Sequence, residues 1–116
     1  MKREYIPDGR FFRVSNFIFN YPLTPIERTV YFYLLCLAGS RGYCWPSVKT
    51  IADKCRCSPS EVRNAIKTLE RQGFIKVCHT YQENGPGKNR QSNNQYFINA
   101  LPPNWRETEP VRYKPS

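Results

Sequence analysis

The chain of 116 residues lacks the features that mark secreted and membrane-spanning proteins. Its longest apolar run has nine residues, at positions 30–38, whereas a helix that crosses a bilayer needs roughly 20. The N-terminus has no charged segment followed by an apolar one, so we expect no secretory signal. The five cysteines are odd in number, which argues against a disulfide framework. We therefore expect a protein of the reducing cytoplasm.

Residues that support catalysis or metal binding are also scarce. His79 is the single histidine, and no acid pair or nucleophile with a nearby base stands at a telling spacing. Cys55, Cys57, Cys78 and His79 are potential zinc ligands, but only one residue separates the first two, and both have packing roles. We expect no enzymatic activity, no cofactor and no metal.

Acidic residues are half as numerous as basic ones. The chain has 18 Lys and Arg against 9 Asp and Glu, a formal net charge of +9. Ten of the basic residues and four of the acidic ones lie in residues 41–91, so the excess is concentrated there. A basic surface attracts phosphates by releasing counterions, which makes nucleic acid the first partner to consider. Charge alone leaves an acidic membrane or protein as the alternative.

The length allows one domain with a single core. We place this domain at residues 11–100, after a flexible arm at 1–10 and before a proline-rich tail at 101–116. Residues 11–19, FFRVSNFIF, alternate at first and then turn aromatic, which predicts an extended segment packed on the core. Trp105 in the tail is expected to tuck onto the domain.

A capping box predicts the start of the first helix. Thr24 is the N-cap, Pro25 takes the first helical position and Glu27 completes the box. The helix is expected to run to about Ala38, where Gly39 ends it. Its apolar face contains Ile26, Val30, Tyr33, Leu34 and Leu37. Apolar residues also fill most of the remaining circumference, so the helix is either buried within the monomer, which we favour, or offers a second face to another copy.

Residues 47–73 predict two short amphipathic helices joined by a tight turn. Ser47 caps the first of them, the turn lies at 56–57, and Ser58 and Glu61 repeat the capping box. The buried stripes are Val48, Ile51, Ala52 and Cys55 in one helix and Val62, Ala65, Ile66 and Leu69 in the other. With so short a turn, the two helices must cross steeply and share one core.

The second helix of this pair is the most firmly specified element. Cys57 and Val62 stand where a hydrophobic staple fixes the entry of the chain, and Gly73 closes the helix. Its exposed face carries Ser60, Arg63, Asn64, Lys67, Thr68 and Arg71. Many helices have a merely solvated charged face. Asn64, however, is a modest helix former that solvation alone would not favour mid-helix, so we expect this face to bind a ligand.

After Gly73 the apolar residues recur at every second position, which is the pattern of a β-strand. Residues 74–81 predict one strand, and residues 95–99 predict its antiparallel return. The first strand is expected to place Ile75, Val77, His79 and Tyr81 on one side. The connection at 82–94 carries Lys88 and Arg90 near its tip, which suits contact with a nucleic-acid backbone, although a merely flexible loop explains it nearly as well.

The connector before the second helix contains a short extended piece at 43–45 that can pair with the hairpin. Trp45 abuts Pro46 and the next helix cap. We therefore expect it to plug the core, with a base-stacking platform as the alternative role.

Residues 44–75, CWPSVKTIADKCRCSPSEVRNAIKTLERQGFI, resemble the winged helix-turn-helix domains of bacterial, plasmid and phage regulators and replication initiators. In that family a W-P-S lead-in precedes the second helix and a small Cys or Gly turn follows it. The run S-x-x-T-V-R-x-A-I-x-x-L-E-x-x-G-x-I then forms the recognition helix and first wing strand, and this chain has Glu61 in place of the Thr. LTPIERTVYFYLLCLA also resembles the family's first helix, so the similarity covers about residues 14–98. It implies an α+β fold with a three-helix core and a two- to three-stranded β-hairpin wing.

The resemblance also implies sequence-specific binding of double-stranded DNA. A recognition helix at about 59–72 would enter the major groove, flanked by a basic wing at about 74–98. The implied base-reading residues are Ser60, Arg63, Asn64 and Lys67. The implied phosphate-binding residues are Lys49, Thr50, Ser58, Arg71, Lys76, Lys88 and Arg90. Glu61 could accept from a cytosine amine, but its carboxylate is already occupied by the capping box, and we favour the cap.

The biological role stays open among several alternatives. We expect replication initiation or regulation of a plasmid, phage or mobile element. The alternatives are a transcriptional repressor of a chromosomal operon and a winged-helix protein-interaction module. Besides double-stranded DNA, the partners to test are a second copy through the first helix and a replication or transcription protein, with no membrane partner expected.

Overall fold

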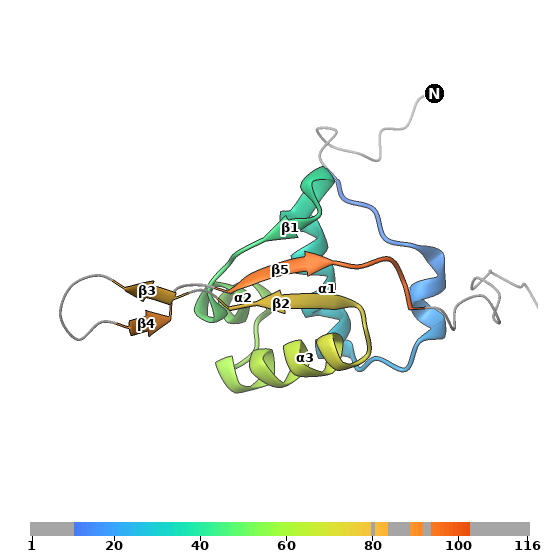
Figure 1. Ribbon diagram of the computed structural model, residues 1–116. Helices are drawn as coiled ribbons and strands as arrows, with labels where there is room; N and C mark the ends of the chain where they lie inside the picture. Colours follow the sequence, from blue (N-terminus) through green and yellow to red (C-terminus); the bar gives the residue numbers. More distant parts are fainter. Residues whose placement is uncertain (1–10, 80, 84–88, 92–93, 103–116) are drawn as a thin grey trace, which may run out of the picture.

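The computed structural model describes residues 11–79, 81–83, 89–91 and 94–102. Its body consists of three α-helices and a small three-stranded antiparallel sheet (Figure 1). The helices are α1 (Pro25–Ala38), α2 (Val48–Cys55) and α3 (Pro59–Arg71). The sheet has the order β1-β5-β2, formed by β1 (Tyr43–Cys44), β5 (Gln95–Ile98) and β2 (Ile75–Cys78). The predicted α+β winged helix-turn-helix architecture is therefore confirmed.

The helix starts follow the predicted capping chemistry. In α1, the Thr24 amide donates to Glu27 Oε1 at 2.9 Å, and the Glu27 amide donates to Thr24 Oγ1 at 3.2 Å. The same box opens α3, where the Ser58 amide donates to Glu61 Oε1 at 2.8 Å and the Glu61 amide donates to Ser58 Oγ at 3.1 Å. Each box satisfies two backbone donors that a helix start leaves unpaired.

The turn between α2 and α3 depends on one left-handed residue. Arg56 has φ 59° and ψ 47°. This backbone conformation costs roughly 1–2 kcal/mol for a residue with a Cβ. The Cys57 amide donates to the Ala52 carbonyl at 3.1 Å, which stabilises this turn. Cys57 itself packs against the core cluster that contains Val62, in agreement with the predicted staple.

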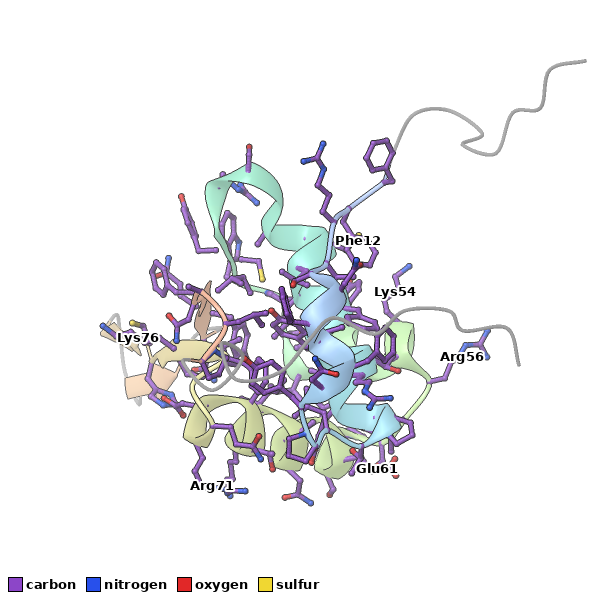
Figure 2. The ribbon with its side chains drawn as sticks, turned by 90° about the vertical axis from the view of Figure 1, so that its right-hand side faces the viewer. Phe12, Lys54, Arg56, Glu61, Arg71 and Lys76 are labelled. Carbon is purple, nitrogen blue, oxygen red and sulfur yellow. The ribbon has the colours of Figure 1, made fainter. Side chains whose placement is uncertain are left out.

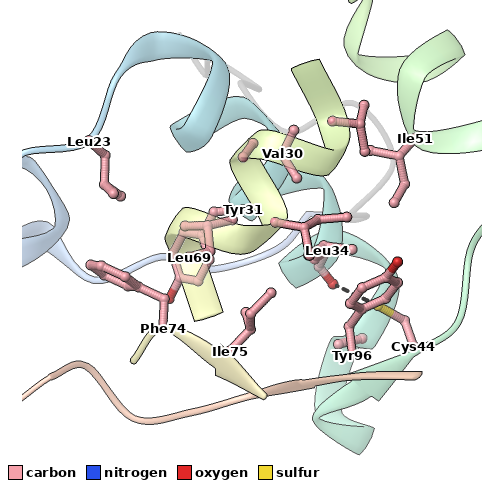
Figure 3. Close-up of a cluster of buried hydrophobic side chains, with 14 of the residues drawn as sticks. Leu23, Val30, Tyr31, Leu34, Cys44, Ile51, Leu69, Phe74, Ile75 and Tyr96 are labelled. Carbon is pink, nitrogen blue, oxygen red and sulfur yellow. Dashed lines mark hydrogen bonds between the residues drawn. The ribbon is translucent and has the colours of Figure 1, made fainter. Parts of the chain in front are cut away.

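The core lies between the three helices and the inner face of the sheet (Figure 3). Its largest fully buried side chains are Tyr96, Phe74, Ile18, Leu34, Ile51, Leu69, Ile75, Val30 and Val62. The predicted face of α1 is only partly confirmed: Val30 and Leu34 are buried, whereas Ile26, Tyr33 and Leu37 are half-buried. Tyr31 and Ala38 are buried in addition. The Tyr31 and Phe74 rings meet edge-on with their centroids 5.4 Å apart. The side of α1 that carries Tyr31 therefore faces the start of the wing.

The strand register separates an inner from an outer row of side chains. Cys44 and Val77 both pair with Tyr96 in the inner row, and Tyr43 and Lys76 both pair with Phe97 in the next. Successive side chains point to opposite faces of a sheet, so this second row faces outward. The predicted third strand at 43–45 is confirmed over Tyr43–Cys44.

The connection between the main hairpin strands contains structure that the sequence did not predict. A second sheet consists of two strands, β3 (Tyr81–Glu83) and β4 (Asn89–Gln91), and extends the wing away from the helices (Figure 1). Arg90 pairs with Gln82 in this ladder. Lys88, Trp105, the arm at 1–10 and the tail beyond residue 102 lie outside the described residues.

Two predictions about aromatic packing are wrong. Residues 11–19 do not form one extended segment, because a 3-10 helix (Asn16–Asn20) begins after Ser15, whose Oγ accepts from the Phe17 amide at 3.1 Å. Of that segment only Ile18 is fully buried, whereas large apolar side chains before and after it are exposed. Trp45 does not plug the core and is 47% exposed, since Cys44 takes the inward position of β1.

His79 differs from its prediction as well. It was predicted to lie within the first strand, on one side with Ile75 and Val77, but β2 ends at Cys78 and His79 is exposed. Its Nδ1 lies 3.0 Å from the Oδ1 of Asn94, the residue that precedes β5. This contact joins the two sides of the wing at the end of the main sheet.

Candidate nucleic-acid interface

The two faces of α3 have opposite character. Its inner face is buried in the core through Val62, Ala65, Ile66 and Leu69, each at most 8% exposed, as predicted. The opposite face places Ser60, Arg63, Asn64, Lys67 and Arg71 in solvent and leaves Thr68 half-buried. Figure 2 shows Arg71 projecting from α3 away from the body of the protein. One rigid helix thus brings all four predicted base-reading side chains onto one surface.

A cleft lies between α3 and the inner side of the wing. It has a volume of about 510 Å³, and two of the predicted base-reading residues, Arg63 and Lys67, line it from α3. Pro46, Ser47 and Val48 line it from the start of α2, and Val77, His79, Asn94 and Tyr96 line it from the wing. The exposed face of α3 therefore continues into a groove beside the wing.

Several polar residues of this cleft had no predicted role in binding, among them Glu70, His79, Asn94 and Tyr96. His79 and Asn94 contact one another, and the Asn94 side-chain amide donates to the Tyr96 hydroxyl at 3.5 Å. Burial raises the pKa of Tyr96, which keeps the phenol neutral, while the bond from Asn94 opposes this shift. No local pattern predicts this grouping, because pairing of β2 with β5 is what brings Asn94 beside α3.

The hydroxyl groups predicted to bind phosphate lie at helix N-termini. Ser47 Oγ accepts from the Thr50 amide at 3.0 Å and lies 2.9 Å from Thr50 Oγ1 in the first turn of α2. Ser58 Oγ accepts from the Glu61 amide. A hydroxyl that accepts from an amide can still donate its own hydrogen to a phosphate oxygen. Helix N-termini also favour negative charge, so Thr50 and Ser58 occupy positions suited to anions.

The predicted phosphate-binding cations do not form one group. Lys49 is exposed in the first turn of α2. Arg71 lies at the C-terminal end of α3, where its Nη2 donates to Thr68 Oγ1 at 3.4 Å. Lys76 lies instead on the outer row of the sheet beside Phe97, and Figure 2 shows it pointing in a different direction from Arg71. Arg90 belongs to the distal β4 strand, so the wing spreads its basic residues over two separate regions.

Burial affects the two thiols near the helix-turn-helix turn. Burial raises the pKa of Cys55 and of Cys57, and nearby ionisable groups add to both shifts. A thiol must ionise to bind zinc, so a raised pKa opposes that role. Across the described residues there is no group of three or more His, Cys, Asp or Glu side chains that could hold a metal ion.

Residues 21–75 match the model of a protein family described as a helix-turn-helix domain. This part of the chain is similar to that family and has its helix-turn-helix arrangement in α2 and α3. The match covers all three helices and reaches the first residue of β2. Comparisons with curated proteins and with solved structures gave no significant match. Helix-turn-helix domains are DNA-binding units and are typically non-catalytic. Among the described residues, no helix combines the length and the apolar character of a membrane span.

Proposed function

We propose that this protein binds double-stranded DNA in a sequence-specific manner, with α3 in the major groove and the wing beside it. The observation that supports the proposal is that α3 has one buried apolar face and one exposed face of basic and amide side chains. The major groove of B-DNA is about 12 Å wide and admits one α-helix. A helix held by its core contacts over its whole length presents these side chains to base edges in a fixed register.

Each proposed base-reading residue has a chemical counterpart in the groove. The Arg63 guanidinium can donate two bonds to guanine O6 and N7, and the Asn64 amide can pair with adenine N6 and N7. Each such pair discriminates between bases by about 1–3 kcal/mol. Ser60 and Lys67 supply further donors on the same face. The Glu61 carboxylate accepts from the Ser58 amide, which supports a capping role for this residue.

The proposed phosphate contacts surround this helix. Lys49, Thr50 and Ser58 stand at helix starts, and Arg71 stands at the far end of α3, so they suit backbone positions on either side of the groove. Such contacts orient the protein without reading sequence. Lys76, Lys88 and Arg90 would add backbone contacts from the wing.

A double substitution on α3 tests the proposal. Preferred sites are first selected from random duplexes. Arg63→Ala combined with Asn64→Ala should then abolish the preference for selected over scrambled duplexes, measured by fluorescence anisotropy. Lys54→Ala is the matched control, because Lys54 is an exposed cation of α2 that points away from α3 (Figure 2). If the double variant keeps the full preference, α3 does not read the sequence.

We further propose that the DNA-binding activity serves replication initiation or regulation of a plasmid, phage or mobile element. The similarity of residues 44–75 to such regulators and initiators supports this role. The arrangement of selected sites distinguishes the alternatives: iterated direct repeats favour an origin-binding protein, and a single inverted repeat favours a dimeric transcriptional repressor.

The exposed aromatic side chains beside α1 favour protein interaction as a second function. Phe11, Phe12 and Phe19 are 62%, 41% and 53% exposed, and the Phe12 ring lies 6.4 Å from the Phe32 ring of α1. We propose that this surface pairs with a second copy of the chain. Sedimentation should show a dimer that Phe12→Ala together with Phe19→Ala converts to a monomer, whereas a concentration-independent wild-type monomer contradicts the proposal.

A further inference from the structure

Aromatic side chains form a row at the β1 edge of the sheet. We define the aromatic platform as Tyr43, Trp45 and Phe97 together with Arg41. The Tyr43 and Trp45 rings are stacked with centroids 5.8 Å apart and an interplanar angle of 29°, and the Tyr43 and Phe97 rings are 5.6 Å apart at 32°. The Tyr43 ring thus contacts both of the other rings and is inclined to each of them. β1 lies at the edge of the sheet opposite β2, the strand that follows α3. The hollow beside Trp45 and the cleft along α3 share one lining residue, Pro46.

Arg41 gives the platform a positive charge in a fixed place. Its guanidinium carbon lies 5.4 Å from the centroid of Tyr43 and 5.0 Å from that of Trp45. Its Nη2 also donates to the Leu37 carbonyl near the end of α1 at 3.4 Å. These contacts hold the guanidinium over the two rings, while the residue as a whole stays exposed. Lys76 adds a second exposed cation in the same outward row as Tyr43 and Phe97.

A hollow beside Trp45 provides space for a planar group. It has a volume of about 220 Å³ and is lined by Leu37, Arg41, Cys44, Trp45 and Pro46. Its walls thus consist of apolar side chains, one guanidinium and one exposed indole. A flat aromatic ligand inserted here would contact both the indole and the guanidinium plane.

We propose that the aromatic platform binds single-stranded DNA, with one unpaired base stacked on Trp45 and Arg41 and the adjoining phosphates held by Arg41 and Lys76. Bases of a duplex already stack on one another, so exposed ring faces of a protein are complementary to unpaired bases. The platform combines such faces with cations, and the chain carries a net charge of +9, which favours a polyanion over an apolar protein surface. The site contains no residue of α3, and Lys76 is the one residue that it shares with the proposed duplex contacts.

Tryptophan fluorescence offers a direct test. Trp45 and Trp105 are the two tryptophans of the chain, so a Trp105→Phe variant reports on Trp45 alone. Titration with a twelve-residue oligothymidylate should quench this fluorescence to saturation, and added salt should reverse the quenching. Absence of quenching at concentrations that saturate anisotropy of the same labelled strand overturns the proposal.

Substitutions then locate the binding energy. Trp45→Ala should weaken oligothymidylate binding about 5- to 150-fold, and Trp45→Phe should restore most of the loss. Lys54→Ala is the control, because Lys54 is an exposed residue of α2 outside both the platform and the proposed dimer surface. Equal losses in the Trp45→Ala and Lys54→Ala variants, or no loss in either, contradict the assignment.

Two further comparisons separate this site from α3 and from other ligands. Trp45→Ala should leave duplex binding unchanged, which also shows that the variant is folded, and Arg63→Ala with Asn64→Ala should leave oligothymidylate binding unchanged. Loss of oligothymidylate binding in that double variant would move the strand to α3 and overturn the platform. Binding of oligouridylate more tightly than oligothymidylate would overturn the choice of DNA as the ligand.

Discussion

Replacing Ser58 by alanine separates the capping role of this residue from its proposed contact with DNA. Ser58 Oγ accepts from the Glu61 amide at 3.1 Å, and alanine leaves that donor without its partner. Loss of an N-cap side chain costs about 1 kcal/mol, with a range of roughly 0.5–2 kcal/mol. For a domain of this size we expect the Tm to fall by about 4–8 °C per kcal/mol, measured by circular dichroism.

Thr24→Ala is the matched control, because Thr24 forms the same capping box at α1 with closely similar distances. Both variants should lose similar stability, and both should stay folded, since typical domains are stable by about 5–15 kcal/mol. Only Ser58→Ala should also weaken duplex binding, by roughly 10- to 150-fold, because a hydrogen bond to a charged group such as phosphate is worth about 1.5–3 kcal/mol.

A glycine at position 58 completes the comparison. Glycine is a tolerable N-cap that costs only a few tenths of a kcal/mol relative to serine, yet it lacks the hydroxyl. Ser58→Gly should therefore be nearly as stable as the wild type while binding duplex DNA as weakly as Ser58→Ala. Equal duplex affinities for Thr24→Ala and Ser58→Ala would refute the proposed phosphate contact, and an unchanged Tm in Ser58→Ala would refute the capping argument.

Two further outcomes are expected. Glu61→Gln keeps an acceptor for the Ser58 amide and removes a negative charge, so all duplexes should bind more tightly without a change in base preference; a changed preference at one base pair, found by repeating the selection, would show that Glu61 reads DNA. Burial raises the pKa of Cys44 from 9.0 to about 11, with Arg41 opposing the shift, so the folded state favours the neutral thiol. Stability is therefore complete below about pH 9 and falls by roughly 1–2 kcal/mol toward pH 11; urea unfolding should show a shallower fall in Cys44→Ala, and equal slopes would contradict this account.

Local chemistry explains which elements were predictable. The capping boxes at Thr24 and Ser58 act within four residues, and the buried stripe of α3 follows from helical spacing alone. The exposed face of α3 was predictable for the same reason, since it is the complement of that stripe. Its proposed contacts with bases and phosphates stay predictions for the binding experiments.

The errors fall where a side chain's position depends on a distant partner. Tyr31 is buried in place of Tyr33 because the Phe74 ring lies beside α1. Trp45 is exposed because β1 pairs with β5 in a register that turns Cys44 inward. Neither β1, with two residues, nor the short connection from β1 to α2 has enough periodicity to indicate which side faces the core.

The sequence by itself determined three helices, their caps, the wing strands and the polarity of α3, because these depend on interactions between residues near one another in the chain. Only the tertiary structure decided the grouping of Arg63 with Asn94 around the cleft and of Arg41 with Tyr43 and Trp45 on the platform. The first of these groupings depends on strand pairing across many residues. The second depends on the register that sends Cys44 inward and leaves the neighbouring rings outside.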